Sequence, residues 1–168
     1  MRQVQIRPLT RAKISQCLPV IQLIMPEVSA EAWQHYALAH LSPGRNAEQG
    51  ILAAEDDRGL VLGLLVYLID RDLVLERMML IKHVVICDYF ESGRKAVIRA
   101  LFAAAEDLAQ CRNCGSIFAR LPLSELAQDH DLIGQVLMSL GHPTNLRKLG
   151  NAITFSVAQT DGRTVRDH

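Results

Sequence analysis

The feature that most constrains the fold is the run Leu60–Ile69, which contains no charged residue and is almost wholly apolar. A strand of this composition has no polar face to turn toward solvent, so we expect it to be covered on both sides. Charged segments with turn composition flank it, Asp56–Gly59 before it and Asp70–Asp72 after it. The sequence therefore predicts a central strand in an antiparallel arrangement with Gly50–Glu55 and with Val74–Asp88.

Helices and further strands are predicted before and after this central unit. An edge strand is expected at Gln3–Leu9, a helix at Ile14–Met25, and a second helix from an N-cap at Ser29 to Leu41, with His35 and His40 on its polar side or rim. After residue 110 we expect a strand at 116–121, a helix at about 129–140 and two strands around 149–151. With 168 residues, 49% of them hydrophobic, the chain can bury one substantial core. We predict a single α/β domain over residues 1–158, with a mixed, mainly antiparallel sheet flanked by helices, and a polar tail over residues 159–168.

A short polar segment, residues 91–95, joins an extended run to an alanine-rich helix. Leu80–Ile86 is rich in β-branched residues, whereas the apolar residues from Val97 to Leu108 recur at helical spacing. The first N–H groups of such a helix lack intrahelical acceptors and lie at the positive end of the helix dipole, so a phosphate can bind there. Gly93 would let the backbone approach the ligand, and Arg94, Lys95 and Arg99 add positive charge. The alternative is an ordinary basic helix start on a solvated surface.

Charge and hydropathy argue against several classes of function. Lys plus Arg equal Asp plus Glu at 18 each, so no overall positive charge attracts nucleic acid or an anionic membrane. The N-terminus lacks an apolar signal core, and charged segments keep every apolar run too short to span a bilayer. We expect a cytoplasmic protein whose function depends on a local site, with neither nucleic acid nor membrane as a partner.

Cysteine usage indicates a reduced protein without a metal ion. Four cysteines are too few for a disulfide scaffold in a chain of this length. Cys111 and Cys114 form a single CxxC, which could be half of a zinc site or a redox pair if His83 or Cys87 lay nearby. Because the sequence has no second CxxC, and because the pair falls where a helix should end, just before Gly115, we interpret both thiols as incidental.

The order of the predicted elements resembles that of the GNAT superfamily of N-acetyltransferases, over roughly Val4–Ala158. In that family the fourth strand and the following helix carry an acetyl-CoA signature, in which an Arg or Gln is followed three and five positions later by small residues. Aligning Arg99–Phe102 with the family's Arg-Ala-Leu-Leu places Gly93, Ala96 and Ile98 on these positions, and only Ala96 keeps a small residue there. The resemblance implies acetyl-CoA as co-substrate, bound through Ile86, Cys87, Asp88, Gly93, Arg94, Lys95, Ala96, Val97, Ile98 and Arg99.

The resemblance also implies catalytic residues. The family often uses a Glu near the start of the fourth strand as general base, which gives that role to Glu76, and Tyr89 falls where the thioester would lie. His83 is a second candidate base. The ordinary alternatives are a solvated carboxylate for Glu76 and a satisfied sheet histidine for His83. In a second signature a Tyr near the end of the last helix protonates the departing thiolate, but Leu137 stands at that position.

Two functions remain open from the sequence. The first is an acyl-CoA-dependent N-acyltransferase that moves an acetyl group to a small-molecule or peptide amine by direct attack, as a monomer or a homodimer. The second, favoured by the degraded signatures, is a non-catalytic GNAT-like module that binds CoA in a regulatory or interaction role. A thiol redox or zinc protein built on the CxxC is a third alternative.

Overall fold

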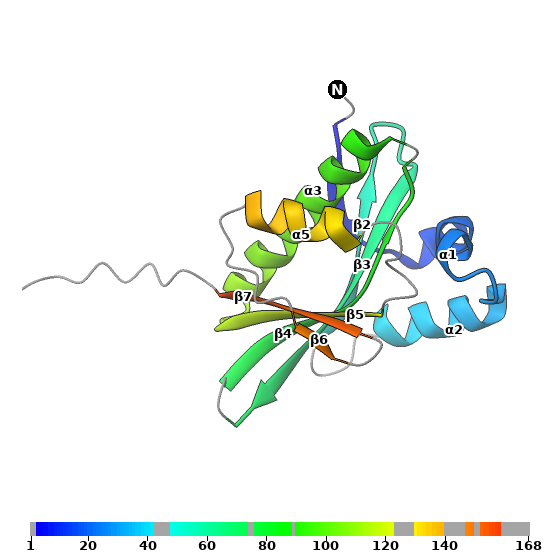
Figure 1. Ribbon diagram of the computed structural model, residues 1–168. Helices are drawn as coiled ribbons and strands as arrows, with labels where there is room; N and C mark the ends of the chain where they lie inside the picture. Colours follow the sequence, from blue (N-terminus) through cyan, green and yellow to red (C-terminus); the bar gives the residue numbers. More distant parts are fainter. Residues whose placement is uncertain are drawn as a thin grey trace, which may run out of the picture.

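The fold consists of one sheet with helices on both faces (Figure 1). The computed structural model describes residues 3–41, 48–73, 76–88, 90–122, 130–139, 147–149 and 152–158. Within these residues the strand order is β1-β2-β3-β4-β5-β7-β6. Neighbouring strands are antiparallel except β4 and β5, which are parallel. The prediction of a mixed, mainly antiparallel sheet is therefore confirmed. The strands are β1 (Gln5–Pro8), β2 (Gln49–Glu55), β3 (Val61–Asp72), β4 (Glu76–Ile86), β5 (Ser116–Pro122), β6 (Arg147–Leu149) and β7 (Ala152–Ala158).

The helices α1 (Leu18–Ile24) and α2 (Ala30–Leu41) cover one face of the sheet, and α3 (Glu91–Cys111) and α5 (His130–Ser139) cover the other (Figure 1). The helix predicted at residues 14–25 is shorter, because two 3-10 turns precede it and α1 itself carries Pro19 in its first turn, where no N–H is needed. The predicted cap of α2 is present: the Ala32 N–H donates to the Ser29 hydroxyl at 3.1 Å.

The apolar strand β3 is buried on both faces, as predicted. Leu64 and Leu65, which are adjacent and point to opposite sides, are 1% and 0% exposed. Leu65 belongs to the core beneath α3 and α5, and Leu64 belongs to the core beneath α1 and α2. The sheet thus separates two hydrophobic cores.

The segment predicted as a polar loop, residues 91–95, belongs instead to the first turn of α3. The helix begins after Phe90, which has an extended backbone, and the Arg94 N–H donates to the Phe90 carbonyl at 3.0 Å. A Lys95–Glu91 ion pair of 2.6 Å between positions i+4 and i lies along this turn. The polar residues 91–95 therefore form a helix start and not a loop. The connection between β4 and α3 is only residues 87–90.

His40 departs from the sequence prediction in a different way. We expected it on the polar side of α2 or at the rim of that side, but it is only 8% exposed. It lies against Tyr36, with ring centroids 4.2 Å apart, and its Nδ1 lies 2.9 Å from the Tyr36 carbonyl oxygen. The local contact one helical turn back makes burial of the imidazole tolerable. His35, by contrast, is exposed as predicted.

None of the helices in the described ranges combines the length and the apolar character needed to cross a membrane.

Candidate functional site

The strand β4 is irregular at Lys82. Val66 on β3 pairs with His83 and the next residue, Tyr67, pairs with Ile81, so Lys82 is an extra residue that bulges from β4. On its other edge β4 pairs with β5 only up to Ile81, which lies opposite Ala119. From Lys82 onward the two parallel strands are no longer hydrogen-bonded to each other. A bulge and a parting of two strands therefore coincide in the middle of the sheet.

A cavity of about 380 Å³ lies at the start of α3. Its walls come from the β4–α3 connection, from the first two turns of α3, from β3 and from the residue that precedes β1. The structure thereby brings together four residues that the sequence assigned to cofactor binding, Asp88, Gly93, Ala96 and Val97. Sequence reasoning missed the other four wall residues, Val4, Leu62, Phe90 and Ser92.

The Asp88 carboxylate lies at the N-terminus of α3. Its Oδ1 accepts a hydrogen bond of 2.9 Å from the Phe90 N–H, and the carboxylate rests against Gly93, where any Cβ would collide with it. The N–H groups of Glu91, Ser92 and Gly93 have no acceptor within the helix. A negative charge is favourable at this end of a helix dipole. The protein therefore places its own carboxylate at the position that suits the phosphate of a ligand.

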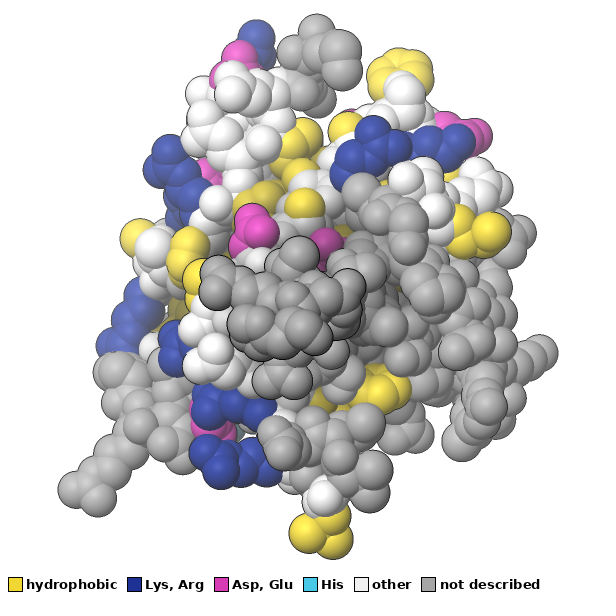
Figure 2. All heavy atoms as spheres, turned by 90° about the vertical axis from the view of Figure 1, so that its left-hand side faces the viewer, with side chains coloured by type: hydrophobic (Ala, Val, Ile, Leu, Met, Phe, Trp, Pro, Cys, Tyr) yellow, Lys and Arg dark blue, Asp and Glu magenta, His cyan; other side chains and the backbone are white. Residues whose placement is uncertain are grey.

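The predicted basic residues of this region do not all converge on the cavity. The Arg94 guanidinium donates to the Asp88 carbonyl oxygen at 3.2 Å, Lys95 pairs with Glu91, and Arg99 is exposed further along α3. On the face shown in Figure 2, Lys and Arg side chains form several separate groups rather than one continuous basic surface. Anion binding here would depend mainly on backbone N–H groups.

Three predicted cofactor residues have side chains in the core, and one of them, Val97, also lines the cavity. Ile86, the last residue of β4, is 6% exposed, and Ile98 is 0% exposed. Both belong to the core beneath α3. Their side chains therefore pack between α3 and the sheet, and only their backbone groups could face a ligand.

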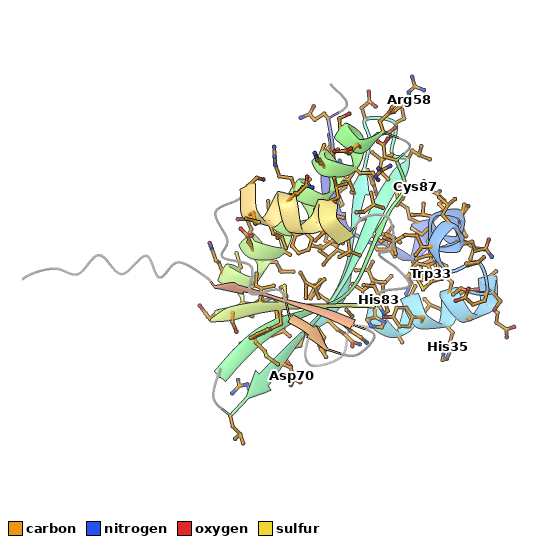
Figure 3. The ribbon with its side chains drawn as sticks, in the orientation of Figure 1. Trp33, His35, Arg58, Asp70, His83 and Cys87 are labelled. Atoms are coloured by element: carbon orange, nitrogen blue, oxygen red, sulfur yellow. The ribbon has the colours of Figure 1, made fainter. Side chains whose placement is uncertain are left out.

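A second cavity, of about 240 Å³, lies on the opposite face of the sheet between α1, α2, β3 and β4. Its walls are apolar side chains together with Tyr36 and His83. The rings of Tyr36 and His83 meet edge to face with centroids 6.0 Å apart, and Lys82 Nζ lies 5.8 Å from the centroid of the Tyr36 ring. Figure 3 shows His83 beside α2, near the place where β4 and β5 part. The bulge thus presents a titratable ring to an apolar cavity.

Of the two residues predicted as catalytic, the structure describes only the backbone of Glu76. Glu76 is the first residue of β4 and lies ten positions before Ile86, which at the rise of an extended strand corresponds to roughly 30 Å. Its side chain lies outside the described part of the structure, as does the whole of Tyr89. Leu137, at the position of the family's Tyr, is 0% exposed and packs in the core beneath α3.

The thiols near these cavities are poor nucleophiles. Burial raises the pKa of the Cys87 thiol, and the negative charge of Asp88 raises it further. Burial likewise raises the pKa of Cys17, to about 11. At neutral pH both remain protonated, so neither is suited to carry a covalent acyl group.

The CxxC pair is split by the end of α3. Asn113 has a left-handed backbone (φ 56°), and the Asn113 and Cys114 N–H groups donate to Gln110 and Ala109 carbonyls at 3.0 and 2.8 Å. This is a Schellman motif, with Asn113 in place of the glycine expected at 115. Cys114 is buried and Cys111 is exposed. Within the described residues no three His, Cys, Asp or Glu side chains group as metal ligands would.

Comparison with known proteins adds information on the fold. No family model matches the sequence, and no curated protein sequence matches it. Among solved structures, the ribosomal-protein-S5-alanine acetyltransferase from Vibrio fischeri matches with a TM-score of 0.71 at 14% identity, over 96% of each chain. A putative acetyltransferase from Salmonella typhimurium, solved with its cofactor acetyl-CoA, matches with a TM-score of 0.67 at 13% identity, over 95% of this chain and 96% of that one.

A third similar structure is an acetyltransferase of the GNAT family from Streptococcus pneumoniae. It matches with a TM-score of 0.64 at 11% identity, over 94% of this chain and all (100%) of that one. These likenesses extend over nearly the whole length of both partners, and at such low identity they concern the fold. The fold predicted from the order of the elements is therefore confirmed as that of the GNAT acetyltransferases.

Proposed function

We propose that this chain, which has the fold of the GNAT acetyltransferases, is an N-acetyltransferase that moves an acetyl group from acetyl-CoA to a primary amine. The observation that carries the proposal is the bulge of β4 at Lys82, where β4 also parts from β5. Beyond this point the strand leads directly to the N-terminus of α3. The same short stretch of chain thus offers an opening in the sheet, a titratable ring and a helix N-terminus.

The residues around the start of α3 suit the pyrophosphate of acetyl-CoA in one respect and oppose it in another. The N–H groups of Glu91, Ser92 and Gly93 point out of the first turn, and the cavity of about 380 Å³ borders them. The Asp88 carboxylate occupies the same end of the helix. Binding therefore requires this side chain to rotate away, after which Gly93 leaves room for close approach of an anion.

The chemistry balances as a direct transfer. When bound, acetyl-CoA supplies an acetyl group activated as a thioester. The lone pair of the acceptor nitrogen forms a bond to the carbonyl carbon, and the carbon–sulfur bond breaks with its electron pair leaving on sulfur. The nitrogen loses one proton and the thiolate gains one. The raised pKa of the Cys87 thiol supports direct attack rather than an acyl-cysteine route.

We assign the role of proton acceptor to His83. It is half-buried, it directly follows the bulge, and it lines the cavity between α2 and β4. A neutral imidazole can take a proton from the amine directly or through one water. Glu76 remains the prediction from sequence, at the far end of β4 from this cavity. Tyr89 likewise remains a catalytic residue predicted from the sequence alone.

The competing function is a non-catalytic CoA-binding module. Leu137, fully buried at the position of the family's Tyr, favours this alternative because it cannot protonate a leaving thiolate. The two functions share the cofactor site and differ in turnover. A binding measurement and a rate measurement on the same protein therefore separate them.

The test is calorimetric titration with acetyl-CoA together with a CoA-release assay over a panel of amines. We expect a micromolar dissociation constant, about 8 kcal/mol of binding free energy. His83→Gln should lower the rate about 100-fold without changing acetyl-CoA affinity. His35→Gln, an exposed histidine on α2, is the matched control and should keep full activity.

The remaining outcomes discriminate among the alternatives. Loss of activity in Glu76→Gln with a fully active His83→Gln would return the role of base to Glu76. Binding of acetyl-CoA without turnover of any amine would identify the non-catalytic module. No heat and no thermal shift at millimolar CoA would exclude both functions.

A further inference from the structure

We infer that the acceptor is a small primary amine with an apolar body, such as an arylalkyl amine, that carries no second positive charge. This inference rests on the proposed function and concerns the cavity of about 240 Å³ between α1, α2 and the sheet.

The size and walls of the cavity define the body of the acceptor. Apart from Tyr36 and His83, the wall is formed by apolar side chains, including Ile21, Trp33, Leu64 and Val85. An apolar cavity of about 150 Å³ accommodates a benzene molecule, so the present cavity is large enough for one aromatic ring with a short alkyl chain. Removing such a group from water is favourable, at roughly 25 cal/mol for each Å² of apolar surface buried.

The wall is fixed rather than adaptable. The Trp33 indole N–H donates to the Ile14 carbonyl at 2.7 Å, which holds α2 to the segment before α1. The Trp33 and Tyr36 rings stack with centroids 6.2 Å apart. A rigid aromatic wall favours a flat or compact apolar group. It offers few hydrogen-bond partners to a polar acceptor such as an amine on a sugar.

Charge around the cavity disfavours a polycation. The basic groups beside it are His83, which lines it, and Lys82 and His40, which both contact the Tyr36 ring of its wall. Among the described residues that line it there is no Asp or Glu. A second ammonium group would therefore be desolvated near a positive charge with no carboxylate to pair with it.

The same surroundings prepare the reacting amine. Burial in an apolar site and a nearby positive charge both disfavour an ammonium ion, so they lower the pKa of a bound amine. The neutral amine is the nucleophile. Its nitrogen, with the apolar body inside the cavity, would lie beside His83, which takes up the proton released when the nitrogen–carbon bond forms.

Ala32 supplies a direct test. This residue of α2 lines the cavity while being exposed, so it lies at the mouth. Ala32→Phe should fill the entrance without disturbing the core. Ala39→Phe is the matched control, because Ala39 is an exposed alanine on the same helix that does not line the cavity.

The experiment measures 2-phenylethylamine and spermidine as acceptors, and also the binding of 2-phenylethylamine by calorimetry without acetyl-CoA. We expect kcat/KM for 2-phenylethylamine to exceed that for spermidine by about tenfold or more. Ala32→Phe should lower both the kcat/KM for 2-phenylethylamine and the affinity for this amine by about tenfold, which is about 1.4 kcal/mol. Ala39→Phe should change neither.

Equal use of both amines, a preference for spermidine, or an unaffected Ala32→Phe variant would overturn the inference. A different result would be a protein that binds 2-phenylethylamine but no acetyl-CoA, and that loses amine binding on the Ala32→Phe substitution. This result would support the cavity as an amine site and contradict the proposed function. The two failures are thus distinguishable.

Discussion

Asp88 performs at the start of α3 the role that a bound phosphate would otherwise take. Its carboxylate accepts the Phe90 N–H and rests on Gly93 at the positive end of the helix. The glycine is required here because a side chain at position 93 would collide with the carboxylate. Under the proposed function, the Asp88 carboxylate and the pyrophosphate of the cofactor would compete for this end of α3.

Removing the charge of Asp88 should therefore favour the ligand. Asp88→Asn keeps a side-chain acceptor for the Phe90 N–H but removes the negative charge, so CoA should bind more tightly. Loss of the charge–dipole interaction should lower the free energy of unfolding by roughly 0.3–1 kcal/mol. Calorimetric titration with CoA and urea unfolding measure the two effects. Asp107→Asn, an exposed carboxylate in the same helix, is the control. Weaker CoA binding by Asp88→Asn would show that the carboxylate assists the ligand.

Sequence reasoning found the residues of this site that are consecutive in the chain and missed the others. Asp88, Gly93 and Ala96 follow from a strand that leads into a helix. Val4 and Leu62 join them only through the pairing of β1, β2 and β3, which no local pattern reveals. Trp33, Tyr36 and His40 recur at helical spacing, but this pattern does not indicate that His83 will meet them.

At the scale of the elements, the approach of α3 to the sheet depends on Gly63. A Cβ on this residue of β3 would lie 2.8 Å from the Val85 carbonyl oxygen and 2.8 Å from Val97 Cγ1. Both neighbours are buried. The glycine therefore permits the close packing that places the first turns of α3 beside β3.

Two Gly→Ala substitutions should act in opposite directions. Gly63→Ala overpacks the interface and should lower the free energy of unfolding by about 1–3 kcal/mol. Gly134→Ala lies within α5 with no atom near the added methyl group, so it should raise the free energy of unfolding by roughly 0.5–1 kcal/mol through helix propensity. Urea unfolding of both variants checks the prediction. A Gly63→Ala variant as stable as the wild type would mean that α3 can shift away from the sheet at no cost.

The sequence predicted the existence of most elements better than their ends. Strong periodicity located α3, but its first turn was read as a loop because Glu91, Ser92 and Lys95 are polar. Its end was correctly predicted at the CxxC pair, just before Gly115, but the left-handed residue that follows the helix is Asn113. Caps depend on single residues, and several residue types satisfy the same cap.

At the scale of the whole molecule, the sheet is a shared wall between two cores, so a change in either core affects the stability of the domain. The core beneath α1 and α2 contains Trp33, Ala37 and the apolar face of β3 that includes Leu64. His40, one turn beyond Tyr36 on α2, is buried at the edge of this core. It is one of the few buried polar residues in the described chain.

Burial lowers the pKa of His40, and the positive charges of Lys82 and His83 lower it further, against the opposing effect of its hydrogen bond to the Tyr36 carbonyl. Because the folded pKa is below that of the unfolded chain, near 6.5, the unfolded state binds more protons at acidic pH. The contribution of neutral His40 is therefore fully present above about pH 6.5 and is lost as the pH falls toward the folded pKa.

We expect the free energy of unfolding to fall between pH 7.5 and pH 5, and the stability advantage of the wild type over His40→Gln to shrink over the same interval. Urea unfolding at four or more pH values measures both curves. His35→Gln, at an exposed position of α2, should run parallel to the wild type. The difference in the free energy of unfolding between the wild type and His40→Gln could instead stay constant with pH or grow on acidification. Either result would show that His40 takes up its proton in the folded protein without cost.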